Sequence, residues 1–195
     1  MNLNNIGKVV ATALERKNSV QIYRHIEGLN IDCEFDDTKE TLLLRYKLTA
    51  TLNAKSKGKT VCIIMQNPSY ANEDISDKSV NFLEQLIFKK DIDYFKDVYK
   101  IIIVNQFAEV KTEDFTPNDN SIGERNNDII EQEIKNSEII IIAWGSSNRF
   151  NKRKKFVHKI LNSMSSKTIL TTKKHPSLGS LNKEFLSNYS EYKKI

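Results

Sequence analysis

Amide, imidazole and lysine side chains stand directly after four short apolar runs of the sequence. In chain order these segments are Gln66-Asn67-Pro68-Ser69-Tyr70, Asn105-Gln106-Phe107, Trp144-Gly145-Ser146-Ser147-Asn148 and Lys173-Lys174-His175-Pro176-Ser177. Amides and an imidazole offer hydrogen-bond donors and acceptors that suit the edge of a nucleobase. An aromatic ring can stack on a nucleobase, and lysine can form an ion pair with a phosphate group. The residue types therefore indicate binding of a base or of nucleic acid.

Each of these groups also has a purely structural interpretation. Asn67 precedes Pro68 and could initiate a turn, and Asn105 could satisfy backbone groups of a loop. Trp144 suits a buried core, and His175 could be an ordinary half-buried histidine. The joint placement of such groups at four turns, rather than any single residue, favours a site.

The elements that would position these groups follow from the apolar pattern. Near-continuous apolarity predicts strands covered on both faces, at Val61 to Met65, Ile101 to Val104, Glu138 to Ala143 and Thr168 to Thr171. Helical stripes lie between them, at Val80, Leu83, Leu86 and Ile87, at Ile129, Ile130 and Ile134, and at Phe156, Val157, Ile160, Leu161 and Met164. This alternation predicts an α/β fold with a largely parallel sheet and helices on both sides, in which ligands bind beyond the carboxyl ends of the strands.

The first 45 residues have a different pattern. We predict helices around Leu3 to Arg16 and Val20 to Leu29, then the acidic stretch CEFDD, then a possible edge strand from Leu42 to Leu48. The chain is accordingly divided into an N-terminal helical elaboration, residues 1–45, and a single compact α/β domain, residues 46–195.

The composition sets the class of protein. The chain has 195 residues, of which 39% are hydrophobic and 28% charged, which suits one folded domain. It contains no apolar run long enough to span a bilayer and no signal-peptide pattern, so we expect a cytoplasmic protein without a membrane partner. Cys33 and Cys62 form no recognisable disulfide or metal pattern, and no metal or cofactor is expected. The formal net charge of +5 fits a polyanionic partner without requiring one.

The basic run Lys152-Arg153-Lys154-Lys155 has two interpretations. It could be a solvated helix face, which is the usual role of such runs, or it could contact nucleic acid.

Five motifs together resemble a known family. The elements RYKL, MQNPSYA followed by Asp77, IIIVNQF, IIIIAWG and KKHPS resemble the bacterial domain of unknown function 1643 over roughly residues 45 to 182. The same order of motifs is similar to that of the uracil-DNA glycosylase superfamily. This resemblance implies a three-layer α/β/α sandwich around a short, mainly parallel central sheet.

The resemblance also implies roles for individual residues. Gln66 and Asn67 would form the loop that holds the water and the backbone oxyanion site, and Asn105 would read the Watson-Crick edge of a flipped base. His175 would donate a hydrogen bond to the carbonyl oxygen that gathers negative charge, and Ser177 would bind a phosphate. An aromatic ring should stack on the base, and the candidates are Tyr70, Phe82 and Phe107. The expected nucleic-acid contacts, taken from the residue types and the basic run as well as from the resemblance, are Ser69, Lys152, Arg153, Lys154, Lys155, Lys173, Lys174 and Leu178.

The chain departs from that superfamily at several positions. Asn67 stands where the most active branch has aspartate, and an amide cannot take a proton from water as a carboxylate can. Ser69 and Tyr70 replace a tyrosine and a histidine, and the side chain that would fill the vacated base stack would be Leu178 or Leu181.

Three functional hypotheses remain open. The leading one is a uracil-DNA-glycosylase-like protein that binds a nucleobase or nucleic acid, most simply DNA, with uracil excision weak or lost. The second is an active, metal-independent glycosylase that hydrolyses the N-glycosidic bond of uracil or of a mismatched base in DNA repair. The third is an interaction module with a vestigial pocket that recruits a protein partner through its N-terminal helices.

Overall fold

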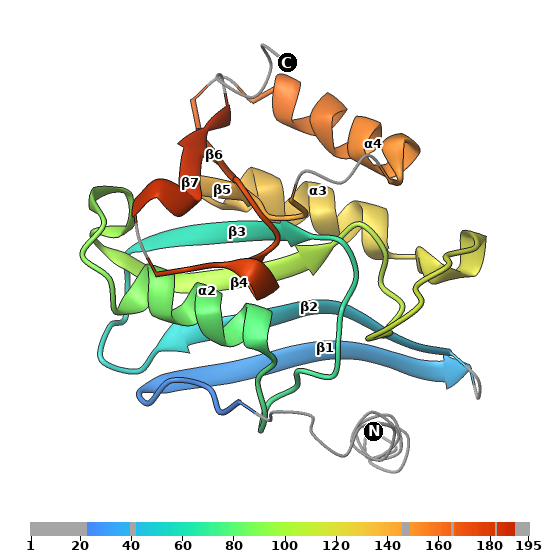
Figure 1. Ribbon diagram of the computed structural model, residues 1–195, viewed down its shortest axis with the longest axis horizontal. Coiled ribbons are helices and arrows are strands. Elements are labelled where there is room, and N and C mark those ends of the chain that lie inside the picture. The colour runs from blue at the N-terminus through green and yellow to red at the C-terminus, as the bar shows by residue number, and fades with distance from the viewer. Residues whose placement is uncertain (1–22, 40–41, 146–148, 165, 182, 190–195) are drawn as a thin grey trace.

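Seven strands of the described chain form one sheet (Figure 1). The structure, a computed structural model, describes residues 23–39, 42–145, 149–164, 166–181 and 183–189. The strands lie in the order β1-β2-β4-β3-β5-β6-β7. Their bounds are β1 Leu29–Lys39, β2 Leu42–Leu52, β3 Lys59–Met65, β4 Val98–Asn105, β5 Ile139–Ile142, β6 Thr168–Thr172 and β7 Leu186–Asn188.

The sheet is mixed, which corrects the prediction of a mainly parallel one. The four strands β4, β3, β5 and β6 are parallel, as the apolar runs predicted, but β1, β2 and β7 are antiparallel to their neighbours. The segment from Leu42 to Leu48 is part of a strand, yet β2 lies between β1 and β4 rather than at an edge. The edge is β1, whose acidic residues face partly outward and whose pattern is therefore not continuously apolar.

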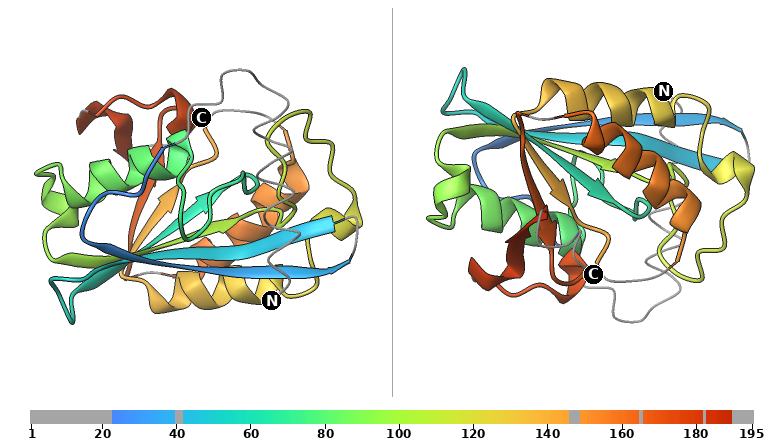
Figure 2. Two further views of the ribbon diagram at one scale, coloured as in Figure 1. Left: turned by 90° about the horizontal axis from the view of Figure 1, so that it is seen from below. Right: turned by 90° about the horizontal axis from the view of Figure 1, so that it is seen from above.

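Three α-helices of the described chain connect the parallel strands, and all three were predicted. They are α2 (Lys78–Phe88), α3 (Asn126–Asn136) and α4 (Asn151–Asn162). Figure 2 shows the sheet with α2 on one side and α3 and α4 on the other. Right-handed crossovers produce this arrangement, because the chain moves from β3 to β4 in one direction and then from β4 to β5 and β6 in the opposite direction. Within the described residues, no helix has the length and apolarity needed to cross a membrane.

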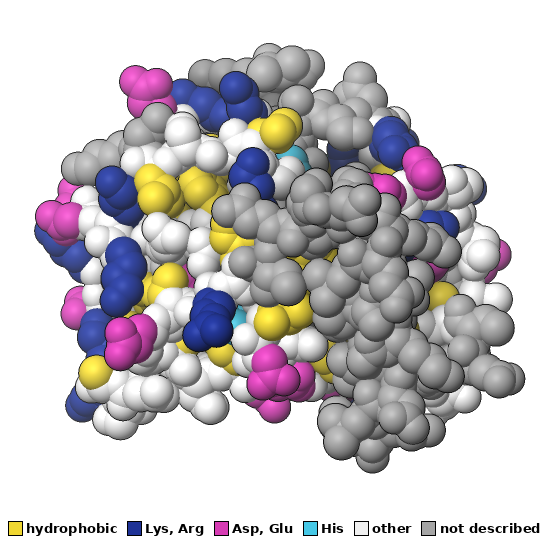
Figure 3. Space-filling model, turned by 60° about the horizontal axis from the view of Figure 1, so that its bottom comes forward, with side chains coloured by type: hydrophobic (Ala, Val, Ile, Leu, Met, Phe, Trp, Pro, Cys, Tyr) yellow, Lys and Arg dark blue, Asp and Glu magenta, His cyan; other side chains and the backbone are white. Residues whose placement is uncertain are grey.

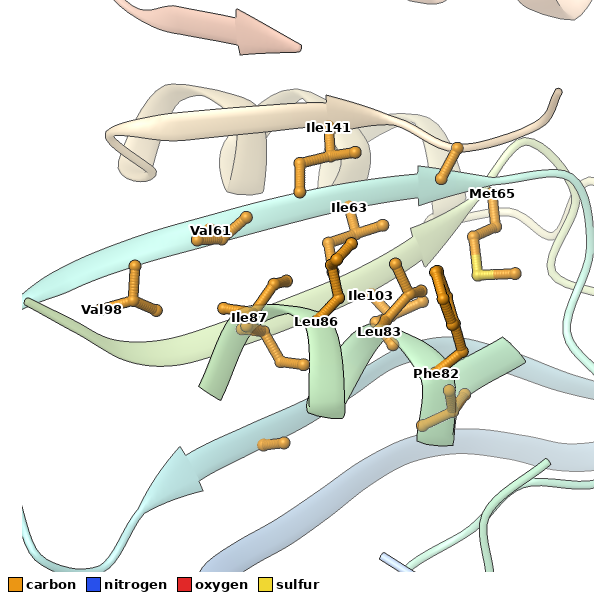
Figure 4. Packing of buried hydrophobic residues seen from close by; sticks show 14 of the residues in the cluster. Val61, Ile63, Met65, Phe82, Leu83, Leu86, Ile87, Val98, Ile103 and Ile141 are labelled. Carbon is orange, nitrogen blue, oxygen red and sulfur yellow. The ribbon is translucent and has the colours of Figure 1, made fainter. Parts of the chain in front are cut away.

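Alternate residues of the central strands belong to two separate cores. On the α2 side, Ile63 and Ile103 pack against Leu83 and Leu86, whose side chains point toward β3 and β4 (Figure 4). The other core combines the remaining positions of these strands with the apolar stripes of α3 and α4, and it includes Cys62, Ile64, Ile102, Val104, Ile130, Ile134, Val157 and Leu161. The polar groups at the strand ends therefore face one of two sides, depending on their position in the alternation.

The structure corrects one N-terminal prediction. Residues 23–28 contain no helix, and β1 begins at Leu29, so the predicted helix from Val20 to Leu29 is wrong over its described part. Tyr23 instead forms an antiparallel bridge with Ser76. The predicted helix from Leu3 to Arg16 lies outside the described residues.

A buried ion pair holds this segment against α2. Nδ1 of His25 lies 2.5 Å from Oε1 of Glu84, and Nε2 lies 2.8 Å from the main-chain oxygen of Asn72. Because both ring nitrogens face acceptors, the imidazole donates from both and is protonated. The second oxygen of Glu84 accepts the N–H of Ile26 at 3.1 Å. Burial opposes the charge, but the hydrogen bond to Glu84 and its charge outweigh burial, so the pKa of His25 is raised.

Three further segments are short 3-10 helices, at Asp93–Phe95 (η1), Asp119–Ser121 (η2) and Lys183–Phe185 (η4). A fourth, η3 (Pro176–Leu178), follows His175 and packs against α2. The contact between η3 and α2 brings the end of β6 to the α2 side of the sheet.

Candidate functional site

The segments that follow β3 and β4 run side by side. Met65 is level with Asn105 in the parallel pair. Beyond them, the N–H of Gln106 donates to the oxygen of Met65 at 2.9 Å, and the N–H of Phe107 donates to the oxygen of Gln66 at 3.1 Å. The loop after β3 and the loop after β4 therefore leave the sheet together.

The segments that follow β5 and β6 also touch. Gly145 has φ +73°, and a Cβ at this position would lie 2.8 Å from the main-chain nitrogen of His175. Only glycine combines this backbone conformation with so close an approach. The structure thus brings the segment after β5 into contact with the segment after β6, as it does the segments after β3 and β4.

Asn105 ends β4 with a side chain that has no partner. It follows Ile101 and Ile103 in the alternation, so it faces the α2 side. The residue is 1% exposed, and both its amide nitrogen and its amide oxygen lack a hydrogen-bond partner among the described residues. An unsatisfied buried polar group costs about 1–3 kcal/mol, so a side chain with two such atoms suggests a bound ligand or water.

A β-bulge in β2 sends a charged side chain to the same side. Glu34 pairs with Lys47 and Phe35 pairs with Arg45, so Tyr46 is an extra residue in β2. A bulge of this kind shifts the alternation by one position and redirects the side chains beyond it. Arg45 therefore faces the α2 side, although strict alternation would send it to the other.

Arg45 is adjacent to Asn105 on this surface. Leu48 and Ile103 are paired across β2 and β4 on the α2 side, and Arg45 and Asn105 occupy the next positions along their strands on that side. Arg45 is 2% exposed, donates from Nη1 to the oxygen of Ala71, and has no partner for Nε among the described residues. A buried guanidinium beside a free amide gives this end of the sheet additional hydrogen-bond donors.

The carboxylate of Asp77 interacts electrostatically with Arg45, His175 and Tyr70. Its carboxylate caps α2 by accepting the N–H of Val80 at 2.8 Å. Burial lowers the pKa of Arg45 and that of His175, and the negative charge of Asp77 opposes both changes. Burial and the same charge raise the pKa of Tyr70. Side chains from β2, from the loop after β3 and from the end of β6 therefore share an electrostatic environment at the N-terminus of α2.

His175 is held as a neutral hydrogen-bond donor. Its Nδ1 accepts the main-chain N–H of Ser177 at 3.2 Å and lies 2.9 Å from the Ser177 hydroxyl oxygen. Burial lowers the pKa of His175, so the ring is neutral at pH 7. Because Nδ1 accepts a main-chain N–H, the single proton of the neutral ring is on Nε2.

Asn67 has hydrogen bonds both within its own loop and to the segment after β4. The amide nitrogen of Asn67 donates to the oxygen of Lys111 at 2.6 Å and to that of Pro68 at 3.2 Å. Its amide oxygen accepts Nε2 of Gln66 at 3.3 Å. Asn67 thus joins the loop after β3 to the segment after β4.

Changing Asn67 to aspartate is expected to destabilise the protein by about 2 kcal/mol. The substitution would put a carboxylate oxygen against the carbonyl oxygens of Lys111 and Pro68, which now accept the amide N–H groups. Chemical denaturation of Asn67→Asp, beside the control Asn53→Asp in an exposed turn, measures this cost. Equal stability of the two variants would contradict the assigned contacts.

The candidate stacking rings differ in their surroundings. Phe82 of α2 packs edge-on against Phe185, with ring centroids 4.7 Å apart, and a Cβ on Gly179 would lie 2.5 Å from the Phe82 ring. Tyr70 is half-buried close to Asp77. Phe82 is therefore enclosed by its neighbours, and Tyr70 is the more accessible candidate.

Phe107, the third candidate, belongs to an aromatic cluster. Its ring makes edge contacts with Phe115 (5.2 Å between centroids) and Phe150 (5.0 Å). The guanidinium of Arg153 lies 5.8 Å from the Phe107 centroid. These contacts give the ring a packing role and leave it buried.

The basic run of α4 is not a single solvated surface. Arg153 is buried at 8% exposure, and Lys154 is half-buried with its Nζ 5.8 Å from the Trp144 centroid. Lys152 and Lys155 are exposed. Helical periodicity explains the difference, because position 153 shares the inward face with Val157 and the neighbouring positions do not.

The other predicted nucleic-acid contacts lie at or near the surface. Lys173 and Lys174 are exposed, Ser69 and Ser177 are half-buried, and Leu178 is 68% exposed. On the face seen in Figure 3, basic side chains are interspersed with acidic ones. The charge on that face is mixed, and no continuous basic surface is visible among the described residues on it.

Comparison with known proteins identifies a family for most of the chain. Residues 45–178 match the family described as Protein of unknown function (DUF1643). None of the curated proteins matches the chain. None of the solved structures matches it either.

Proposed function

The chain belongs to the family described as Protein of unknown function (DUF1643), and from its own residues we propose that it binds a nucleobase, free or within nucleic acid. The proposed site lies beyond the ends of β3, β4 and β6, on the α2 side of the sheet. The residues proposed to act there are Asn105, His175, Arg45 and Tyr70.

The observation that carries this proposal is the side chain of Asn105. It presents a buried donor and a buried acceptor, neither of which has a partner in the described chain. A pyrimidine such as uracil carries an N–H beside a carbonyl oxygen, which is the complementary pair for an amide. Base-binding proteins recognise an extruded base through such hydrogen bonds. A bound base would therefore give the amide nitrogen and the amide oxygen of Asn105 the partners that they lack.

His175 supplies a second point of recognition in the proposal. A neutral ring with its proton on Nε2 can donate to a carbonyl oxygen of the base. Its opposite nitrogen is fixed by the N–H of Ser177, so the ring orientation is set before a ligand arrives. Such a preorganised donor would also stabilise negative charge on a departing base.

The resemblance to uracil-DNA glycosylases supports the same proposal. The four parallel strands, with helices on both sides, are compatible with an α/β/α sandwich of that type, and four of the five resembling motifs include or follow the carboxyl ends of these strands. We propose, however, that conventional uracil excision is weak or lost. Asn67 offers no carboxylate to activate water, and its amide is engaged by Lys111 and Pro68. The absence of a general base typically costs 10²- to 10⁴-fold in rate.

The test combines binding and excision measurements on the whole chain. Calorimetric titration with uracil should show binding, and His175→Ala should weaken it about tenfold through loss of one hydrogen bond. Lys159→Ala, at an exposed position of α4, serves as the control and should bind as the unmodified protein does. Oligonucleotides containing uracil, mismatched thymine or deaminated purines should release no base at a rate comparable to a repair enzyme.

Other outcomes would select other functions. Rapid release of free base that His175→Ala abolishes would identify an active glycosylase and overturn the statement that excision is weak or lost. Failure to bind any base, together with a stable complex with another protein, would identify an interaction module.

A further inference from the structure

A second group of buried polar atoms without partners lies on the opposite side of the sheet. Asn126 of α3 donates from Nδ2 to the main-chain oxygen of Gln106 at 3.2 Å, and Arg153 of α4 donates from Nε to the same oxygen at 2.7 Å. The main-chain oxygen of Gln106 therefore accepts from the side chains of both Asn126 and Arg153, and Asn126 donates to the main-chain oxygen of Asn105 as well, at 3.0 Å. Both helices pack on the side away from α2, so this group is separate from the proposed base site.

Four side-chain atoms of this group remain unsatisfied. They are Nε2 and Oε1 of Gln106, Oδ1 of Asn126 and Nη2 of Arg153, and none has a partner among the described residues. Gln106 and Asn126 are 0% exposed and Arg153 is 8% exposed. In native proteins such atoms are rare, and several together indicate a bound polar group.

Arg153 adds an uncompensated positive charge. Its guanidinium lies 4.9 Å from the Phe156 centroid and 5.8 Å from that of Phe107, and its Nη1 donates to Asn127 at 2.7 Å. Burial lowers its pKa to about 10, and no charge in the described chain contributes to the shift, so the group is still charged at pH 7. A buried charge without a counter-ion is costly, and a bound anion would relieve that cost.

The kinds of free atoms narrow the choice of anion. Nη2 of Arg153 and Nε2 of Gln106 are donors, whereas Oε1 of Gln106 and Oδ1 of Asn126 are acceptors. Sulfate and carboxylates accept hydrogen bonds only, so they would leave both amide oxygens unmet. A phosphate group that keeps a proton accepts and donates at once.

We propose that Gln106, Asn126 and Arg153 form a binding site for a protonated phosphate group. The phosphate would accept from Arg153 and Gln106 through its charged oxygens and donate its own hydroxyl to an amide oxygen. This site does not depend on the proposed base site, because the two use consecutive residues of the chain, Asn105 and Gln106, on opposite sides of the sheet.

The experiment measures thermal stability and binding of the whole chain with inorganic phosphate at constant ionic strength. Phosphate should raise the melting temperature in a concentration-dependent manner, and sulfate at equal ionic strength should raise it by clearly less. Calorimetry with phosphate, and separately with a mononucleotide, distinguishes free phosphate from a phosphate ester as the better ligand. Equal responses to phosphate and sulfate, or no response to either, would overturn the proposal.

Variants test whether the stabilisation by phosphate depends on Arg153 and Gln106. Arg153→Gln should abolish the phosphate response, whereas Lys152→Gln, which removes the same charge from an exposed position of the same helix, should keep it. Because loss of Arg153 could prevent folding, Gln106→Met provides a second measurement. It retains the arginine, and it should weaken phosphate binding at least tenfold, since one donor and one acceptor are lost. An unchanged phosphate affinity in Gln106→Met, or equal losses in Lys152→Gln and Arg153→Gln, would contradict the site.

Discussion

Replacing Glu84 by alanine is expected to lower the free energy of unfolding by about 3 kcal/mol. The carboxylate is 0% exposed and binds both the His25 ring and the N–H of Ile26, so its removal leaves a buried imidazolium and a buried amide unpaired. Denaturant titration measures the change. Glu131→Ala is the matched control, since Glu131 is a half-exposed glutamate paired with Lys135 on α3, where the expected cost is below about 0.5 kcal/mol.

The same pair makes the stability depend on pH in a defined direction. The pKa of His25 is raised in the folded state above its usual value of 6.5. The pair therefore contributes fully below pH 6.5, and its contribution is lost as the pH rises through the folded pKa. The unfolding free energy should fall over that range in the unmodified protein and should fall less in Glu84→Gln. Identical pH profiles would show that His25 is not charged in the folded state.

Replacing Asn105 by leucine is expected to have opposite effects on stability and on ligand binding. Leucine has a similar size and removes two buried polar atoms that lack partners, so the free protein should be at least as stable as before. Uracil binding should weaken about 100-fold or more, because the base would lose two hydrogen bonds and leave its own polar groups unmet, at about 1–3 kcal/mol each. Melting curves and calorimetry on one preparation measure both quantities.

The control for this variant is Asn136→Leu at an exposed position near the end of α3. It should leave the uracil affinity unchanged. A large loss of stability in Asn105→Leu would mean that the amide is satisfied by permanently bound water rather than by a ligand. Unchanged uracil affinity would remove Asn105 from the proposed site.

The central part of the fold could be predicted because its elements have strong periodic signals. The residues around Ile63 are apolar at every position, as expected for a strand that is covered on both faces. The sequence of α2 has a regular apolar stripe, as expected for a helix with one buried face. The antiparallel strands were harder to predict. Among residues 29–38 of β1 only Cys33 is buried, so the apolar pattern that identifies β3 is absent there.

The sequence located the strand ends that carry the candidate residues, but it did not show to which side of the sheet each side chain points. The residues after β3, β4 and β6 lie together, because parallel strands place their carboxyl ends at one edge. Arg45 was not identified as a site residue, since its side depends on the extra residue Tyr46, and a one-residue irregularity leaves no periodic signal. Asp77 did have a signal, because an aspartate directly before an apolar helical stripe is a typical N-cap.

Buried polar atoms without partners have no sequence signature at all. The sequence of Asn105-Gln106 is typical of a polar loop, and only the structure shows that both side chains are buried without hydrogen-bond partners among the described residues. Arg153 was grouped with its lysine neighbours, yet one of the two aromatic rings near it, that of Phe107, comes from a distant segment. Tertiary contacts of this kind decide which polar residues are available to a ligand.

The position of the β1–β2 hairpin has a consequence for biosynthesis. The ribosome completes this hairpin before it makes β4, the strand that lies against β2 in the sheet. A two-stranded hairpin alone is only marginally stable in water. Leu48 and Ala50 of the nascent chain, although paired with β1, thus lack their partners in β4 until translation has passed Ile103.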